Sequence, residues 1–185
     1  VSCQGDIKRI VSSDLVITSR YHAKVFALSD YSGIVRSLIM AKHAGQRLAG
    51  KQLGFLIAEH CLCDWTLYDY CIPVPLHWTR YAARGFNQAA LIAEVIYDRY
   101  GIPVSKKVFR RVKTAYQARL ERNKRFSNMV NAFYISEKDK QEYTNKHLVI
   151  IDDLMTTGST LVALGKVLAH CNPASITVVV AARVV

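Results

Sequence analysis

The stretch that decides the fold is Leu148–Thr160, which reads LVIIDDLMTTGST. Its first four residues form a continuous apolar run, which is typical of a central parallel strand buried on both faces. Two adjacent carboxylates, Asp152 and Asp153, follow at the carboxyl end of this strand, where open α/β sheets bind their ligands. A loop of small hydroxyl residues then turns through Gly158 into an expected helix. The stretch therefore predicts a strand–loop–helix unit that carries a ligand site.

The chemistry of this unit favours a sugar phosphate. Free backbone N–H groups at a helix start, together with Thr and Ser hydroxyls, can hold a phosphate dianion. Carboxylates beside a phosphate would repel it unless they faced hydroxyl groups or a cation. Neighbouring strand residues point to opposite sides, so the two aspartates need not share one role. The plainer alternative is a strand end with paired acids, followed by an ordinary Ser/Thr helix cap.

The rest of the chain alternates between the two kinds of element, which predicts an α/β fold with a mainly parallel sheet flanked by helices. The expected strands are Lys24–Leu28, Tyr70–Leu76, Asn131–Ser136 and Ile176–Ala181. The expected helices are Tyr31–Met40, Leu48–Cys63, Gln88–Tyr100 and Ser159–His170. A polar loop is expected before Asn87, and a polar turn over Glu137–Lys146. We predict one domain, 1–185, with 1–65 as a candidate helical N-terminal appendage.

A second anion-binding loop is predicted after the strand that ends near Pro73. The chain continues through Val74, Pro75 and Leu76 to a basic loop that carries Arg80 and Arg84. A guanidinium group suits such a loop because it binds phosphate oxygens in a bidentate manner. The alternative is a solvated turn that leads to a helix cap at Asn87.

A strongly basic segment follows. Lys106–Gln117 contains five basic residues and no acid, and the arginines that come next recur every three residues, as on one face of a helix. Aromatic residues are interleaved with these charges, so the segment could follow a single-stranded DNA backbone and stack its bases. The alternatives are a solvated face and aromatic rings that belong to the core. The candidate DNA-binding residues are Lys106, Lys107, Arg110, Arg119, Arg122 and Arg125.

Composition limits the class of protein. The chain has 185 residues and a formal net charge of +11, which implies an affinity for polyanions or phosphorylated small molecules. No apolar run is long enough to cross a membrane, and no signal peptide is recognisable, so we expect a cytoplasmic protein. Five cysteines, an odd number, argue against a disulfide framework. Cys61 and Cys63 lie near His60 and His77, but the spacing does not suit zinc and no metal ligand is predicted in the protein.

Several motifs resemble known proteins. The segment Asp152–Thr160 is similar, position for position, to the signature of type I phosphoribosyltransferases. With Pro73–Leu76, the block Arg84-Gly85-Phe86-Asn87-Gln88, and residues Arg111, Thr114, Gln117, Leu120, Arg125, Asn128 and Phe133, it resembles the ComF family of competence-associated proteins. That family usually begins with a four-cysteine zinc module. Only Cys3 precedes residue 61 here, so we predict no zinc.

The resemblance implies a type I phosphoribosyltransferase-like fold that binds phosphoribosyl diphosphate (PRPP) with Mg²⁺. It implies a ribose and 5-phosphate site made of Asp152, Asp153, Met155, Thr156, Thr157, Gly158, Ser159 and Thr160. The diphosphate would be bound by Val74, Pro75, Leu76, Arg80 and Arg84. Arg111–Gln117 would be a loop that closes over the substrate, and the candidate catalytic residues are Asp152, Asp153, Arg111 and Lys113.

Three functions remain open. The first is a phosphoribosyltransferase that acts on an acceptor for which no residue pattern identifies a general base. The second is a catalytically silent PRPP sensor or single-stranded DNA-binding protein. The ComF resemblance implies a role in processing incoming DNA during natural transformation, with other competence proteins as partners. The third, a purely structural subunit, predicts that the two aspartates can be replaced without effect.

Overall fold

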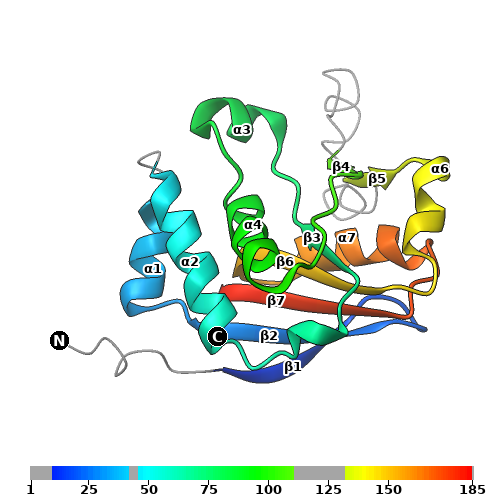
Figure 1. Cartoon of the computed structure of the whole chain (residues 1–185), viewed down its shortest axis with the longest axis horizontal. Coiled ribbons are helices and arrows are strands. Elements are labelled where there is room, and N and C mark those ends of the chain that lie inside the picture. Colours follow the sequence, from blue (N-terminus) through cyan, green and yellow to red (C-terminus); the bar gives the residue numbers. More distant parts are fainter. Residues whose placement is uncertain (1–9, 42–45, 111–131, 185) are drawn as a thin grey trace, which may run out of the picture.

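The computed structural model describes residues 10–41, 46–110 and 132–184. Five strands form one sheet in the order β1-β2-β7-β6-β3 (Figure 1). Their bounds are Ile10–Val16 (β1), His22–Asp30 (β2), Tyr70–Pro73 (β3), His147–Met155 (β6) and Ser175–Arg183 (β7). β2, β7, β6 and β3 pair in parallel, and β1 pairs antiparallel with β2 at one edge. The mainly parallel sheet predicted from the sequence is confirmed.

The central strand β6 is buried on both faces, as its apolar run predicts. All four residues of Leu148–Ile151 are 0% exposed. Leu148 and Ile150 belong to one core cluster, and Val149 and Ile151 belong to the other. Removing each such side chain from water contributes about 1.5–3 kcal/mol to folding. The doubly buried run ends at Ile151, and the two aspartates follow it within the same strand, where the side chains become partly exposed.

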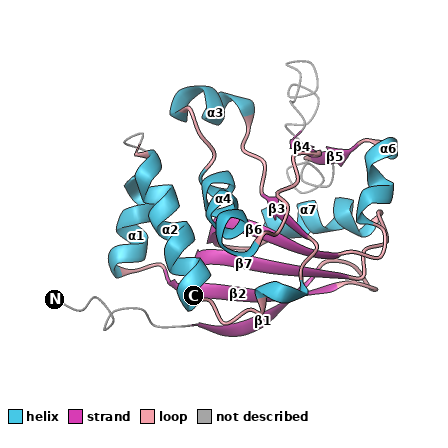
Figure 2. Ribbon diagram, viewed as in Figure 1, coloured by secondary structure: helices cyan, strands magenta, loops and turns pink. Residues whose placement is uncertain are grey.

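Helices cover both faces of the sheet (Figure 2). On one face lie α1 (Gly33–Met40), α2 (Arg47–His60) and α4 (Gln88–Tyr100), and on the other lies α7 (Ser159–Ala169). α2 and α4 approach closely at Gly54, where an added Cβ atom would lie only 2.8 Å from Val95 Cβ. Across the described residues, no helix is both long and apolar enough to cross a membrane.

The N-terminal part of the chain, expected as a helical appendage over 1–65, also contributes strands to the main sheet. Besides α1 and α2, it supplies β1 and the inner strand β2, which pairs with β7. Edge strand β1 (IVSSDLV) has polar residues at its centre, so its sequence lacks the apolar run of a buried strand. Its pairing with β2 depends on tertiary context that a local pattern does not report.

Two segments expected to be irregular are helical. The loop expected before Asn87 contains α3 (Trp78–Arg84), and the turn expected over Glu137–Lys146 contains α6 (Glu137–Lys140) and the 3-10 helix η5 (Gln141–Tyr143). No residue of α3 is buried, so it has no apolar stripe to reveal it. A further 3-10 helix, η3, spans Trp65–Leu67.

A small ribbon stands apart from the main sheet. β4 (Val108–Arg110) pairs antiparallel with β5 (Phe133–Ile135), and these strands flank the basic segment 111–131, which lies outside the described residues. Val108, Phe133 and Ile135 are buried in the cluster that also contains α7 residues. Figure 1 shows the ribbon and α3 at the same end of the molecule.

Candidate functional site

A cavity of about 250 Å³ lies at the carboxyl ends of β3 and β6. Its walls come from the β3–α3 loop and α3, the start of α4, β4, and the segment from the end of β6 to the start of α7. The lining residues are Val74, Pro75, Leu76, Arg80, Arg84, Asn87, Gln88, Ala89, Arg110, Asp152, Asp153, Leu154, Thr156 and Thr160. The fold thus brings together the two loops that the sequence assigned to the two ends of one ligand.

Both aspartates line this cavity, although alternation along a strand would send them to opposite faces. β6 continues to Met155, beyond the expected end at Ile151. Asp152 and Asp153 therefore belong to the last residues of this strand. The Asp153 backbone N–H donates to Asp152 Oδ1 at 2.9 Å, which helps to orient the Asp152 carboxylate. Both side chains are partly exposed, so a ligand in the cavity could reach them.

The loop between β6 and α7 turns at Gly158 and is lined by small hydroxyl residues. Gly158 adopts φ +73°, and a Cβ atom there would lie 2.9 Å from Met155 Cε. The hydroxyls of Thr157 and Ser159 are 2.7 Å apart, and Thr157 Oγ1 also accepts from the Ser159 backbone N–H at 3.4 Å. The positive φ and the lack of space together require glycine at position 158.

Only part of this loop reaches the cavity. Thr156 and Thr160 line it, whereas Met155, Thr157, Gly158 and Ser159 are not among the lining residues. Met155 is 5% exposed and its side chain packs in the core, so it can meet a ligand only through its backbone. The predicted 5-phosphate residues therefore divide into two that face the cavity and four that shape the loop.

All five predicted diphosphate residues line the cavity, and Asn87 joins their loop to α4. Val74 N–H donates to the Ile151 carbonyl at 2.9 Å, which extends the pairing of β3 with β6. The Val74 carbonyl in turn accepts from Asn87 Nδ2 at 2.9 Å. Asn87 Oδ1 accepts from the Ala89 N–H at 3.1 Å and so caps α4. One side chain thus holds the loop and the helix start in fixed relation.

Arg110 lines the cavity, although the sequence suggested it as a DNA-binding residue. Its guanidinium carbon lies 5.4 Å from the centre of the Phe133 ring. Burial and the nearby Arg80 lower the pKa of the Arg110 guanidinium, and Asp152 acts in the opposite direction. Arg110 is therefore close to a cation from α3 and to an acid from β6. The cavity lining therefore holds arginines and carboxylates together.

The remaining basic candidates are arranged differently. Lys106 is exposed, whereas Lys107 is ion-paired with Glu142 and with Asp139, 3.5 Å away. The candidates Arg111, Lys113, Arg119, Arg122 and Arg125 lie outside the described residues. In the described part of the chain, no group of three or more His, Cys, Asp or Glu residues is placed to hold a metal ion.

Sequence reasoning assigned no ligand role to four lining residues, Asn87, Gln88, Ala89 and Leu154. The block Arg84–Gln88 was available as a signal, because it joins a basic loop to a helix cap. Gln88 is 5% exposed, and its Nε2 donates to the Leu38 carbonyl at 3.2 Å. Among the described residues, its Oε1 atom has no hydrogen-bond partner.

Comparison with known proteins indicates the family of the chain. The phosphoribosyl transferase domain family model matches residues 91–184. The chain is 37% identical over 103 residues to competence protein F of Haemophilus influenzae, covering 55% of this chain and 44% of that protein. It is 33% identical over 113 residues to the DNA utilization protein YhgH of Salmonella typhi, covering 60% and 48%. The chain spans less than half the length of either relative.

A solved structure is also similar in part. This is an HGPRT-ase from Leishmania tarentolae in complex with GMP, at 14% sequence identity and a TM-score of 0.33, covering 79% of this chain and 66% of that one. So low a score carries no structural argument.

The family model covers half of the chain and includes β6, its two aspartates and the loop that follows, so the chain belongs to the phosphoribosyl transferase domain family. Within that family it is ComF-like, because its relatives are competence protein F and YhgH. The family resemblance predicted from the motifs is confirmed.

Proposed function

We propose that the cavity binds phosphoribosyl diphosphate together with Mg²⁺. This proposal rests on one observation. Three arginines and two aspartates line the same cavity, namely Arg80, Arg84, Arg110, Asp152 and Asp153. PRPP has phosphate groups at both ends of a sugar that bears two hydroxyls. A cavity that holds both arginines and carboxylates complements such a ligand, whereas a plain polyanion would be repelled by the carboxylates.

Each wall has a role in this proposal. Thr156 and Thr160 bind the 5-phosphate near the start of α7. The two aspartates accept hydrogen bonds from the ribose hydroxyls. Arg80 and Arg84 contact the diphosphate, and Arg110 lies near the carboxylate side of the same space. Arg111 and Lys113 remain candidate catalytic residues on the sequence alone.

The donor atoms present suit Mg²⁺. This ion prefers oxygen ligands and is often held by one or two carboxylates plus phosphates of the substrate. Asp152 and Asp153 supply carboxylate oxygens beside the space assigned to the diphosphate. When bound there, the ion would supply charge neutralisation for the phosphate oxygens.

The reaction that this arrangement supports is phosphoribosyl transfer. A nucleophile forms a bond to the anomeric carbon while the bond from that carbon to the diphosphate oxygen breaks. The arginines stabilise the negative charge that leaves with the diphosphate, and the aspartates stabilise positive charge on the ribose. Such preorganised charges are worth several kcal/mol each. A PRPP-binding sensor without turnover is the alternative, and a pyrophosphate-release assay across acceptors separates the two.

The binding proposal is tested by calorimetry with PRPP, with and without Mg²⁺, on the wild type and on Asp152→Asn with Asp153→Asn. If the aspartates hold ribose and Mg²⁺, the double variant binds PRPP at least about tenfold more weakly, as expected when two hydrogen-bonded contacts are lost. If they only lie nearby, neutralising two negative charges strengthens the binding of this anion, which would contradict the proposal.

A matched control is Glu94→Gln with Asp98→Asn, which removes two exposed acids from α4 and changes net charge equally. This control should leave PRPP affinity nearly unchanged. A loss of affinity in the control as large as in the aspartate variant would count against a specific role for Asp152 and Asp153.

We also propose a role with single-stranded DNA. It is supported by the net charge of +11 and by exposed aromatic rings on the β4–β5 ribbon. The names of the relatives refer to competence and to DNA utilization. A salt-dependent affinity for single-stranded DNA is the expected result, since binding releases counterions from the phosphates. Contacts with other competence proteins remain a prediction.

A further inference from the structure

The β4–β5 ribbon has two chemically different faces. One face carries the Arg110–Phe133 register pair and contributes to the cavity and the core. The other face carries the Phe109–Tyr134 register pair, whose rings stack at a centroid distance of 5.4 Å and an interplanar angle of 28°. Phe109 is 45% exposed and Tyr134 is 40% exposed. The ribbon therefore keeps two large rings partly exposed on the face opposite to the one that contributes Arg110 to the cavity.

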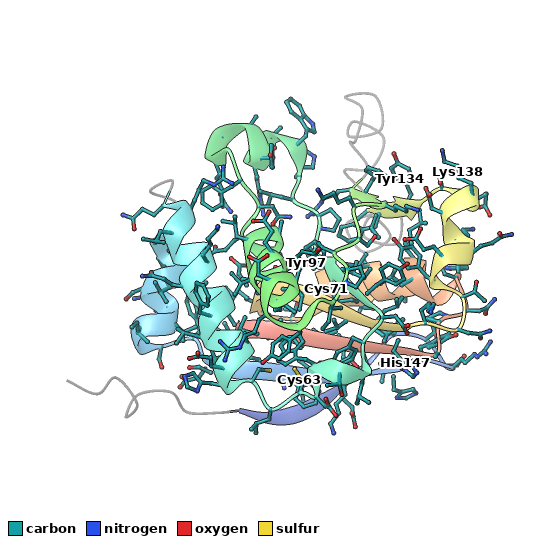
Figure 3. All side chains as sticks on the ribbon, viewed as in Figure 1. Cys63, Cys71, Tyr97, Tyr134, Lys138 and His147 are labelled. Atoms are coloured by element: carbon teal, nitrogen blue, oxygen red, sulfur yellow. The ribbon has the colours of Figure 1, made fainter. Side chains whose placement is uncertain are left out.

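Helix α3 also combines arginines that line the cavity with exposed aromatic side chains. Its residues Arg80 and Arg84 line the cavity, while Trp78 and Tyr81 are 57% and 53% exposed. Trp78 and Tyr81 are three residues apart, so they lie on neighbouring positions of the helix surface. Figure 1 places α3 and the ribbon at one end of the molecule, and Figure 3 places Tyr134 at that end.

Both projections border the same opening, because each contributes arginine to the cavity lining. Each also exposes an aromatic pair. Exposed aromatic rings beside cations are the features with which proteins bind single-stranded nucleic acid, since bases stack on the rings while the cations meet the phosphates. In a duplex the faces of the bases are already stacked on one another, so this surface suits a single strand.

We propose that the Phe109–Tyr134 face of the ribbon is a base-stacking platform for single-stranded DNA, and that Trp78 and Tyr81 of α3 continue this platform across the mouth of the cavity. This inference deepens the proposed DNA role and rests on it, but it does not depend on PRPP binding. It predicts that the DNA binds at the cavity end of the molecule, and not wherever the surface is positively charged.

The test is fluorescence anisotropy with a labelled oligothymidine of about 16 nucleotides, titrated at several salt concentrations. The variant Phe109→Leu with Tyr134→Leu keeps apolar side chains on the ribbon and removes both flat rings. It should bind at least about fivefold more weakly at every salt concentration, because stacking on one ring is worth about 1 kcal/mol or more. Trp78→Leu with Tyr81→Leu should show a loss in the same direction.

Two control variants show whether a loss of DNA affinity comes from the rings of the ribbon. They separate that effect from any change in the ribbon side chains and from a general loss of exposed aromatic surface. Phe109→Tyr with Tyr134→Phe keeps both rings and should retain wild-type affinity. Phe55→Leu with Tyr97→Leu removes two rings that are each 53% exposed on α2 and α4, and it should also bind like the wild type. Thermal unfolding of each variant confirms that the fold is intact.

Equal affinity of the wild type and the ribbon variant overturns the platform, as does an equal loss in the Phe55 and Tyr97 control. Absence of any DNA binding by the wild type overturns both this inference and the proposed DNA role. PRPP calorimetry on the same samples then shows separately whether the cavity binds its own ligand.

Discussion

At the scale of single residues, Gly158 brings the backbone of the loop between β6 and α7 into contact with the core. Its φ of +73° is strained for any other residue, and the space beside its Cα is filled by Met155 and Leu15. Both contacts come from the ends of flexible side chains, Met155 Cε and Leu15 Cδ1, and Met155 is itself buried. The glycine therefore lets the loop lie directly on the core, and the shape of the loop depends on that contact.

We expect Gly158→Ala to lower the free energy of unfolding by about 2–3 kcal/mol, because left-handed strain adds to the lower end of an overpacking cost where the crowding atoms are ends of flexible side chains. Urea denaturation measures this change. Gly101→Ala is the matched control, since Gly101 has φ +72° but no atom within 4 Å of the added Cβ. It should lose only the strain, about 1–2 kcal/mol. Equal losses in the two variants would mean that the contact with Met155 and Leu15 costs nothing.

At the scale of elements, the cavity depends on how the β3–α3 loop is held against α4. Asn87 performs this task, because its amide donates to the Val74 carbonyl and its oxygen caps the helix. A serine at this position can also cap a helix, but its shorter side chain carries no amide to reach Val74.

The variant Asn87→Ser should therefore keep most of the stability of α4 while loosening the loop. We expect PRPP affinity to fall about fivefold, because one hydrogen bond of this kind is worth about 1 kcal/mol. Calorimetry measures the affinity, and urea denaturation measures the stability. Asp64→Ser makes a similar cap exchange in η3, outside the cavity lining, and should leave PRPP affinity unchanged. Unchanged affinity in Asn87→Ser would remove this role for Asn87.

The elements also mark what local sequence can and cannot predict. β6 and α4 are predicted well, because a buried strand and a capped amphipathic helix leave strong local patterns. β1 and α3 are not, since one is a polar edge strand and the other buries no residue. The motif containing Asp152 predicts a site, but placing Arg110 in it requires knowing that β4 reaches the same cavity as the end of β6. That shared cavity joins segments about forty residues apart in sequence and has no local signature.

At the scale of the whole molecule, the cavity joins distant parts of one fold. Its walls include Val74, Arg110 and Asp152, which belong to three different strands or their ends. A ligand bound there contacts segments that separate when the chain unfolds. Because the ligand binds only the folded form, its affinity appears as stability of the whole chain.

Thermal unfolding should therefore report the ligand directly. PRPP with Mg²⁺ at about 100 times its dissociation constant adds about 2.7 kcal/mol, which for a chain of 185 residues raises the midpoint by roughly 5–10 °C. Pyrophosphate with Mg²⁺, or ribose 5-phosphate alone, contacts only one part of the cavity and should raise the midpoint less at the same concentration. If pyrophosphate with Mg²⁺ gave as large a shift as PRPP, the carboxylates and the Thr156–Thr160 loop would contribute nothing to binding, and the cavity would be a diphosphate site without a ribose subsite.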